Sequence, residues 1–441
     1  PVPIINQLTT NDTTPELSGT VEDDVVSLSL AVNGTDYPVT LDETGDWSLP
    51  DDQLTELDEG VHEIMATATD RAGNIGSDST SLELTIDLTI PAAPTSLDLD
   101  AASDSGSIND DNITSVNTPT ISGSAEVGSS IELFEGTTSL GTNTADGSGF
   151  WSITSIAISD GGHFLTTVAT DIAGNNSTAS EALSVTIDTT SPTVTFDSLE
   201  TSDTTPGLSG TLDDTAATVE VSVDGQTVAA TNNGDGTWSL ADNTLTALAE
   251  GTFDVSVTAT DVAGNSDIDT TTAELVIDTT PPAAPSAPDL DDASDSNITD
   301  DDITSDDTPT VSGTAEMGTT IELFSGTTSL GTDTGGTGTW SITSSTLSEG
   351  VHSLTAVATD AAGNSSANSA ALSVTIDTIP PAVTVNNLTT NDETPALGGS
   401  VDDTAATISV SVDDQTVLAT NNGDGTWSLA DNTLTTLAEG T

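Results

Sequence analysis

Aspartates recur in this sequence at positions where loops could bring carboxylates together. A segment of the form ATDxAGN occurs four times, and its aspartates are Asp70, Asp171, Asp261 and Asp360. A second segment, TIDLTIP or a close variant, has its aspartate 17 residues later, at Asp87, Asp188, Asp278 and Asp377. Two kinds of chemistry fit such carboxylates: they cap the backbone of their own turns, or they bind a hard divalent cation.

Two further groups of carboxylates lie in predicted loops. One group follows the second predicted strand of each unit and comprises Glu22, Asp23, Asp24, Glu126, Asp213, Asp214, Glu316, Asp402 and Asp403. The other lies in two long acidic loops and comprises Asp100, Asp104, Asp110, Asp111, Asp291, Asp295, Asp300, Asp301 and Asp302. Loops of this length are uncommon unless something orders them or they are functional, and a cation would order these two. The equivalent shorter loops keep only Asp12, Asp203 and Asp392, which we regard as weaker ligands or caps.

The charge of the chain excludes several classes of partner. With 72 acidic residues and one basic residue, Arg71, the 441 residues carry a formal net charge of -71. Nucleic acids and anionic membranes are polyanions that bind through Lys and Arg, so we expect neither as a partner. The chain has no cysteine and therefore no disulfides. It also has no apolar run long enough to span a bilayer, and we expect no membrane insertion.

The carboxylates belong to an array of repeated units. One tryptophan marks each unit, at Trp47, Trp151, Trp238, Trp340 and Trp427. We assign short units to residues 1–90, 192–281 and 381–441, and long units to residues 91–191 and 282–380. The last short unit ends before its final predicted strands, so we expect the chain to be part of a longer array.

Within each unit, apolar residues alternate with polar ones, as is typical of β-strands. In the segment 253–261, for example, Val255, Val257 and Ala259 share one face. For the third unit we predict strands at 193–199, 206–212, 217–223, 226–231, 237–240, 252–260 and 272–277. Seven short strands in roughly 90 to 100 residues predict an all-β chain of tandem immunoglobulin-like β-sandwiches.

In such a sandwich the two recurrent aspartates lie at opposite poles. The ATD aspartate ends the sixth strand, at the pole where the chain begins, and the TID aspartate ends the seventh. About 20 Å of strand separates them, so they cannot share one ion within a unit. Across a junction they can, and we predict that Asp87 meets Asp171, Asp188 meets Asp261, and Asp278 meets Asp360.

Calcium is the cation that such junctions favour. It takes six to eight oxygen ligands in flexible geometry, and no histidine or cysteine joins the carboxylates, which disfavours zinc. For any single aspartate the alternative of a backbone-capping turn stays open. The fixed spacing in four units favours calcium for the set as a whole.

Other residues suggest structural roles. His62, His163 and His352 each lie eight residues before an ATD aspartate, and Phe253 takes that place in the third unit, which indicates a strand position. A tryptophan that opens the fifth strand is more often a core anchor than a sugar platform. We find no nucleophile with a base, no phosphate-binding loop and no zinc motif, and we predict no enzymatic activity.

The motifs ATDxAGN and IDTTPP, with the long-unit pattern DLDDASDSNITDDDIT…TPTVSGTAEMGTTIELF, resemble the bacterial Ig-like repeats of giant RTX adhesins. The resemblance covers the whole chain, although no glycine-rich nonapeptide repeat is present. It implies a type I-secreted protein of a Gram-negative cell surface, with a long extender array that calcium rigidifies.

The function expected from this resemblance is that of a calcium-stiffened, rod-like and monomeric stalk. It would project a terminal ligand-binding domain for attachment to cells or surfaces and for biofilm formation, with neighbouring repeats as its main contacts. Two alternatives stay open. The units could be tandem glycan-binding modules, or the chain could be an acidic surface-layer-type protein of a halophile, solvated by salt.

Overall fold

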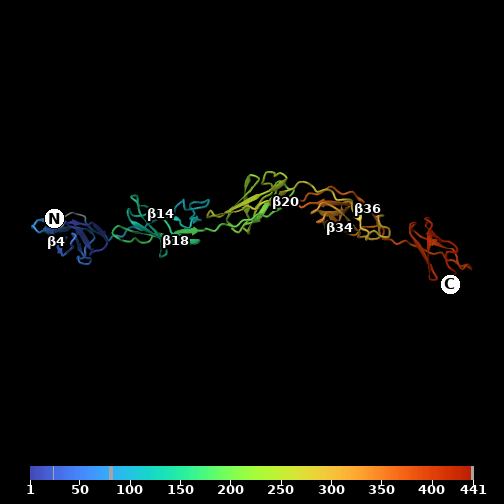
Figure 1. Cartoon of the computed structure of the whole chain (residues 1–441), viewed down its shortest axis with the longest axis horizontal. Coiled ribbons are helices and arrows are strands. Elements are labelled where there is room, and N and C mark those ends of the chain that lie inside the picture. The colour runs from blue at the N-terminus through green and yellow to red at the C-terminus, as the bar shows by residue number, and fades with distance from the viewer. Residues whose placement is uncertain (23, 79–82, 439–441) are drawn as a thin grey trace. The chain divides into compact units, whose positions relative to one another are not determined.

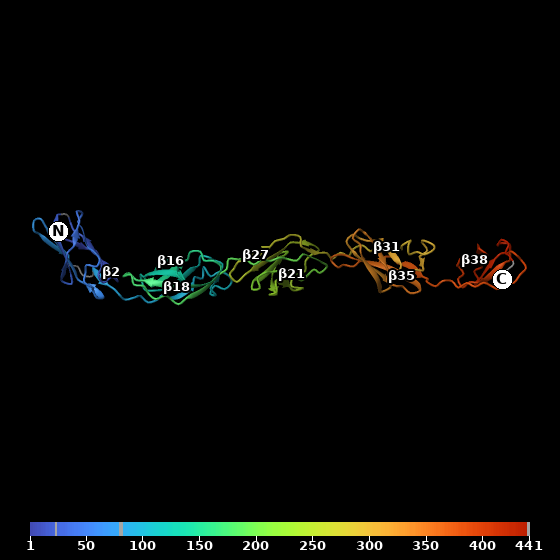
Figure 2. The ribbon, with the colours of Figure 1, turned by 90° about the horizontal axis from the view of Figure 1, so that it is seen from below.

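The computed structural model describes residues 1–22, 24–78 and 83–438, and Asp23 lies outside these residues. Every regular element among them is a β-strand (Figure 1), and Figure 2 shows the same strands from a second direction. By its internal contacts the chain divides into two compact units. The first comprises Pro1–Leu199, Thr205–Leu248 and Thr252–Leu275; the second comprises Glu200–Thr204, Ala249–Gly251 and Val276–Thr441.

The strands group into successive sandwiches. The first contains β1 (Ile4–Ile5), β2 (Leu8–Thr10), β3 (Leu17–Thr20), β4 (Val25–Val32), β5 (Thr35–Tyr37), β6 (Thr40–Leu41), β7 (Asp46–Leu49), β8 (Gly60–His62), β9 (Ile64–Asp70), β10 (Ile75–Asp78) and β11 (Leu84–Ile86). The second contains β12 (Thr95–Leu99), β13 (Ile113–Thr114), β14 (Thr120–Ser124), β15 (Ser130–Glu135), β16 (Thr138–Thr144), β17 (Phe150–Thr154), β18 (Gly161–Thr170) and β19 (Leu183–Ile187). The third contains β20 (Leu199–Thr201), β21 (Leu208–Thr211), β22 (Thr218–Val223), β23 (Gln226–Asn232), β24 (Thr237–Leu240), β25 (Gly251–Phe253), β26 (Val255–Thr260), β27 (Ser266–Asp269) and β28 (Leu275–Ile277).

The remaining strands repeat this pattern. The fourth sandwich contains β29 (Asp289–Leu290), β30 (Ile303–Thr304), β31 (Thr310–Thr314), β32 (Thr320–Ser325), β33 (Thr328–Thr334), β34 (Thr339–Thr343), β35 (Gly350–Thr359) and β36 (Leu372–Ile376). The last group contains β37 (Leu397–Ser400), β38 (Ile408–Val412), β39 (Gln415–Asn421) and β40 (Thr426–Leu429). The prediction of tandem β-sandwiches is therefore confirmed.

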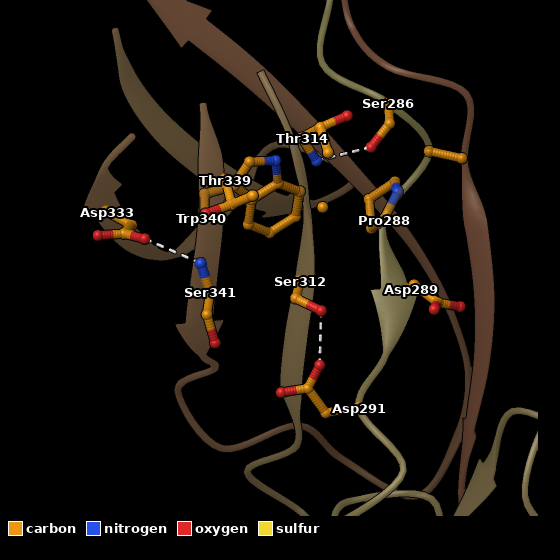
Figure 3. Close-up of a pocket in the computed structure, with 12 residues that line it drawn as sticks. Ser286, Pro288, Asp289, Asp291, Ser312, Thr314, Asp333, Thr339, Trp340 and Ser341 are labelled. Atoms are coloured by element: carbon orange, nitrogen blue, oxygen red, sulfur yellow. Dashed lines mark hydrogen bonds between the residues drawn. The ribbon is translucent and has the colours of Figure 1, made fainter. Parts of the chain in front are cut away.

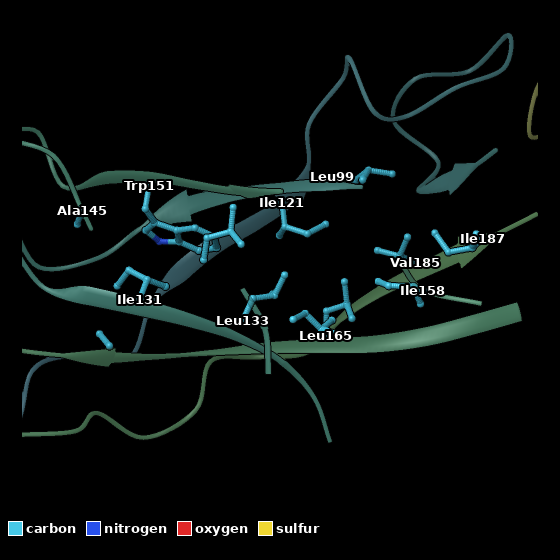
Figure 4. Packing of buried hydrophobic residues seen from close by; sticks show 13 residues of the cluster. Leu99, Ile121, Ile131, Leu133, Ala145, Trp151, Ile158, Leu165, Val185 and Ile187 are labelled. Atoms are coloured by element: carbon cyan, nitrogen blue, oxygen red, sulfur yellow. The ribbon is translucent and has the colours of Figure 1, made fainter. Parts of the chain in front are cut away.

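The second sandwich shows how two sheets enclose a core. The three-stranded sheet β12-β14-β17 faces the five-stranded sheet β13-β19-β18-β15-β16. Figure 4 shows Trp151, a residue of β17, in the core with Leu133 and Leu165 from the opposite sheet. The burial alternates along strands such as β14, β17 and β18, as it must where one face meets the core and the other meets water.

Predicted and observed strands of the third sandwich agree best where the alternation is regular. β22 buries Val219, Val221 and Val223, and β24 covers the predicted 237–240. The predicted first strand is split instead into a single bridge at Val194 and the later strand β20. The predicted sixth strand is interrupted at Asp254. β27, which pairs with β26, was not predicted from the sequence.

A glycine on the neighbouring strand lies against each tryptophan, which explains why every unit has a glycine at this position. All five tryptophans are at most 2% exposed. A Cβ at Gly210 would lie 1.9 Å from the carbonyl oxygen of Thr195 and 2.7 Å from Nε1 of Trp238. The indole of Trp238 therefore occupies the space that any side chain at position 210 would need.

In the first, second and fourth sandwiches the second strand, not the first, runs parallel to the last strand, whereas the first strand is antiparallel to its neighbour. These parallel pairs are β2 with β11, β13 with β19, and β30 with β36. Parallel neighbours begin at the same pole, so the chain enters each sandwich at one pole and leaves at the other. This arrangement places the linkers at the poles.

Candidate junction and loop sites

The ATDxAGN segment forms a turn that its aspartate holds from inside. In the third sandwich, Oδ1 of Asp261 accepts the backbone N–H of Asn265 at 2.8 Å, and Oδ2 accepts its side-chain amide at 2.8 Å. The turns at Asp70, Asp171 and Asp360 have the same pair of bonds. The bonds from Asn74 lower the pKa of Asp70; burial would raise that of Asp171, but the bonds from Asn175 outweigh it. The aspartate thus acts first as a turn cap.

The residue of this turn that reaches the preceding linker is the asparagine. The Nδ2 of Asn175 donates to the main-chain oxygen of Asp87 at 2.8 Å. Asn265 donates to Asp188 at 2.7 Å in the same way. Within the second unit, Asn364 donates to Asp278 at 2.7 Å. Linker and turn therefore meet at the three pairs of positions proposed from the sequence, through an amide and a carbonyl.

A second contact joins the same turn to the loop of the preceding sandwich that is long and acidic in the long units and short in the others. The carbonyl oxygen of the alanine in ATDxAGN is the acceptor each time. Ala173 accepts from the N–H of Asn11 at 2.9 Å, and Ala263 accepts from Oγ of Ser105 at 2.5 Å. In the second unit, Ala362 accepts from the N–H of Ser202 at 2.9 Å.

The linker carboxylates cap the linker itself. One oxygen of each TID aspartate accepts the N–H two residues later, at 2.9 to 3.1 Å, in Asp87, Asp188, Asp278 and Asp377. This cap leaves a second oxygen on each carboxylate. These oxygens are the ones that a junction cation would use.

Carboxylates after the second strand hold the linker of their own sandwich. Asp213 accepts the N–H of Thr193 at 2.6 Å, a bond that lowers the pKa of Asp213. Asp402 accepts from Ala382 at 2.7 Å, and Glu316 accepts from Ala283 at 3.1 Å. Their neighbours Asp214 and Asp403 cap Ala216 and Ala405 within their own loops. Glu126 has only a main-chain bond, its carbonyl accepting from Ser129.

Each long acidic loop contains a buried carboxylate with one unsatisfied oxygen; among the described residues Glu83 and Glu274, on other segments, also have one. Asp104 is 4% exposed and Asp295 is 6% exposed. Oδ2 of Asp104 accepts the N–H of Asn112, and Oδ2 of Asp295 accepts that of Asp300. The Oδ1 of each is buried and has no hydrogen-bond partner among the described residues. An unpaired buried polar atom costs about 1 to 3 kcal/mol, so each of these oxygens is a candidate ligand atom for a cation.

Further carboxylates surround these two. Burial raises the pKa of Asp104, and the charges of Asp111, Asp110 and Asp98 add to the shift. In the fourth sandwich burial raises the pKa of Asp302, followed by the charges of Asp295, Asp289, Asp301 and Asp300. Such a set of oxygens fits calcium, which takes several carboxylates at once.

The sequence analysis missed Asp98 and Asp289 in this set. Both lie on a strand, two residues before Asp100 and Asp291, so their side chains point to the same side of the backbone. Asp111 and Asp301 cap the N–H two residues later. Among the described residues no three His, Cys, Asp or Glu side chains form a ready metal group, and calcium at these positions stays a prediction.

The tryptophans offer no sugar platform. Figure 3 shows an open groove on the fourth sandwich beside Trp340, lined by Asp289, Asp291 and Asp333. Trp340 is 2% exposed, because its ring lies under Gly313. The indoles cannot stack on a ligand in this arrangement.

Sequence profiles place this architecture among known domains. The profile described as bacterial Ig-like domain matches residues 6–88, 89–189, 196–279 and 281–378. A second profile, bacterial Ig-like domain (group 3), matches residues 337–421. A search of curated proteins finds no match to the chain. The part of the chain that the structure describes has no helix long and apolar enough to cross a membrane.

Several solved structures are similar to the chain. One is a tetra-tandem repeat in the extending region of a large adhesion protein, with 24% identity, a TM-score of 0.27, and coverage of 86% of this chain and 100% of that one. Another is a Ca²⁺-stabilised adhesin that helps an Antarctic bacterium bind ice, with 24% identity, a TM-score of 0.30, and coverage of 85% and 98%. A third is from a 1.5-MDa bacterial ice-binding adhesin, with 25% identity, a TM-score of 0.29, and coverage of 65% and 98%.

Proposed function

Because the chain belongs to the bacterial Ig-like domain family, we propose that it is a calcium-stabilised extender segment of a bacterial surface adhesin. Its repeats serve as a stalk that holds a terminal ligand-binding domain away from the cell, for attachment to cells or surfaces and for biofilm formation. The segment is extracellular and monomeric, and its partners are calcium ions and neighbouring repeats. Its role is structural, with no catalytic step.

The unpaired buried oxygens of Asp104 and Asp295 carry this proposal. A folded chain with a net charge of -71 gains stability from any cation that binds only the folded state. A site saturated a hundredfold over its dissociation constant adds about 2.7 kcal/mol. Calcium would be held in each long acidic loop by the buried aspartate and its neighbours, and at the junctions by the free oxygens of the linker aspartates.

At a junction, such a cation would also restrict the linker. Proline fixes one torsion of each IDTTPP-type linker and biases the residue before it towards an extended conformation. The torsions around the linker aspartate stay free. A cation bound by carboxylates of two sandwiches would remove this freedom, and repeated junctions of this kind would make the array stiff.

Scattering on the complete 441-residue chain tests the proposal. We expect a larger maximum dimension and a narrower distribution of shapes in millimolar calcium than in excess EGTA. Sodium chloride at high concentration, without calcium, is the control, because it screens charge but provides no divalent cation for the carboxylates to bind.

Two outcomes would contradict the proposal. If the dimensions and the melting curve are the same in calcium and in EGTA, calcium does not stabilise the array. If salt alone reproduces the effect of calcium, the acidic surface is adapted to salt, as in the halophile alternative.

A further inference from the structure

We infer that the AGN turn of each repeat is a docking surface for the C-terminal pole of the preceding repeat, and that it binds by direct hydrogen bonds without a cation. We call this pair of contacts the clasp: the asparagine amide on the linker carbonyl, and the alanine carbonyl on the equivalent loop of the preceding sandwich, at Asn11, Ser105 and Ser202. The inference is independent of the calcium proposal, because none of the clasp atoms is a carboxylate oxygen.

The clasp uses both N–H donors of the asparagine amide. A side-chain amide has two N–H donors. In Asn265 the Nδ2 atom donates to Oδ2 of Asp261 in its own turn and to the main-chain oxygen of Asp188 in the linker. The aspartate is therefore a positioning residue, which fixes the amide so that it faces the linker.

Glycine and alanine in the motif have roles in the same surface. Gly264 has a φ of 92°, and the equivalent glycines Gly73, Gly174 and Gly363 have φ between 87° and 96°. This left-handed conformation closes the turn and favours glycine. At the second junction the backbones approach so closely that a Cβ at Gly106 would lie 2.2 Å from the carbonyl oxygen of Val262. Small residues thus permit the contact.

Burial of equivalent residues supports docking. Ala173, Ala263 and Ala362, whose turns contact a preceding pole, are 6%, 1% and 7% exposed. Ala72, in the turn of the first sandwich, is exposed, and so is Asn74. That turn has the same internal bonds from Asp70, so its shape does not depend on a partner. The surface is formed in advance, which reduces the entropy that docking costs.

A distance measurement across the second junction tests the clasp. The chain has no cysteine, so exposed Ser139 in the second sandwich and Ala229 in the third can each be replaced by a spin-labelled cysteine. Pulsed electron resonance then gives the distribution of distances in calcium and in EGTA. We expect Asn265→Leu to raise the population of open junctions about five-fold in both conditions, as loss of one net hydrogen bond implies.

Three variants make the result specific. Ser105→Ala removes the other contact without changing the AGN turn, and should also broaden the distribution in EGTA; it removes bonds of Ser105 to Thr114 and Ser115 in its own loop as well. Asn143→Leu is the matched control, because Asn143 donates to the carbonyl of Ser152 within one sandwich; it should leave the distribution unchanged. Asp188→Asn keeps the linker cap but removes the charge, and should act only in calcium.

The possible outcomes distinguish the clasp from the junction cation. If Asn265→Leu and Ser105→Ala both leave the EGTA distribution as it is in the unmodified chain, the clasp is overturned. If they broaden it while Asp188→Asn has no effect in calcium, the clasp stands and the junction cation fails. Circular dichroism of each variant verifies that the sandwiches remain folded.

Discussion

Replacing the two buried aspartates of the acidic loops, as Asp104→Asn with Asp295→Asn, should change stability in opposite directions with and without calcium. Each carboxylate is almost fully buried, and its Oδ1 has no hydrogen-bond partner in the described chain. Without calcium, the substitution removes a buried charge that neighbouring aspartates repel. We therefore expect the long sandwiches to melt at the same temperature or higher in EGTA.

In calcium the same substitution should lower the free energy of unfolding by the amount that the bound ion contributes. At a hundredfold saturation this is about 2.7 kcal/mol per site. A change of 1 kcal/mol moves the melting temperature of a domain of this size by about 4 to 8 °C. The long sandwiches of the variant should thus melt about 10 to 20 °C below those of the unmodified chain.

Differential scanning calorimetry of the complete chain measures both effects. Asp146→Asn is the matched control, since Asp146 lies in the second sandwich and is exposed, and bonds from Ser148 and Phe150 lower its pKa. Its substitution should cost the same in calcium and in EGTA. If the double variant keeps the calcium-induced rise in melting temperature, the acidic loops do not bind the ion.

Three other outcomes follow from the structure. Excess EGTA should lower the melting temperature of the long sandwiches of the unmodified chain by the same amount, about 10 to 20 °C, and an unchanged calorimetric trace would refute this. Burial lowers the pKa of His163, but hydrogen bonds to Glu135 and to the carbonyl of Ser159, with the charge of Glu135, raise it overall. The stabilisation by the His163–Glu135 pair should be complete below the ordinary histidine pKa of about 6.5 and lost as pH rises through the higher folded-state pKa. His163→Phe should abolish this pH dependence of the free energy of unfolding, measured by urea titration. If the free energy still changes with pH in the variant, another group is responsible. Gly210→Ala should lower the free energy of unfolding of the third sandwich by about 1 to 3 kcal/mol or more, because the added Cβ meets Thr195 and Trp238. Denaturant titration measures this change, and an unchanged midpoint would mean that the strand can move to make room.

The sequence predicts the sandwich architecture because one face of most strands is buried. β22 and β26 alternate between buried and exposed residues, and both were predicted near their observed bounds. β27 could not be predicted in this way, since SDID has turn-like composition and none of its residues is buried. Its place is set by pairing with the neighbouring strand β26, which local composition does not reveal.

The candidate sites could also be predicted from the sequence only in part. The spacing of 17 residues predicts aspartates at opposite poles, and hydrogen bonds join the linker to the following turn at three junctions; that the aspartates share an ion stays a prediction. The choice of atoms could not be made from spacing: Asn265 lies 77 residues from Asp188, and which side chain spans the gap depends on how the turn is capped. Burial of Asp104 also depends on the path of its loop. Asp98 and Asp289 could have been found by noting the alternation of DLD along a strand.

The parallel pairing of the second and last strands of a sandwich has a mechanical consequence. In the second sandwich a tensile force on the two ends acts first on β12, which is paired with β14. Force that reaches β13 pulls it and β19 in opposite directions along their shared ladder, where the N–H of Asp188 donates to Thr114 at 2.9 Å and that of Thr186 to Asn112 at 2.8 Å. These bonds are loaded together in shear, whereas a hairpin peels open one bond at a time. Resistance to such loading is a matter of unfolding rate. Asn112 also donates to Asp104, so an ion in the acidic loop would reinforce the ladder at the end where it would otherwise begin to slip.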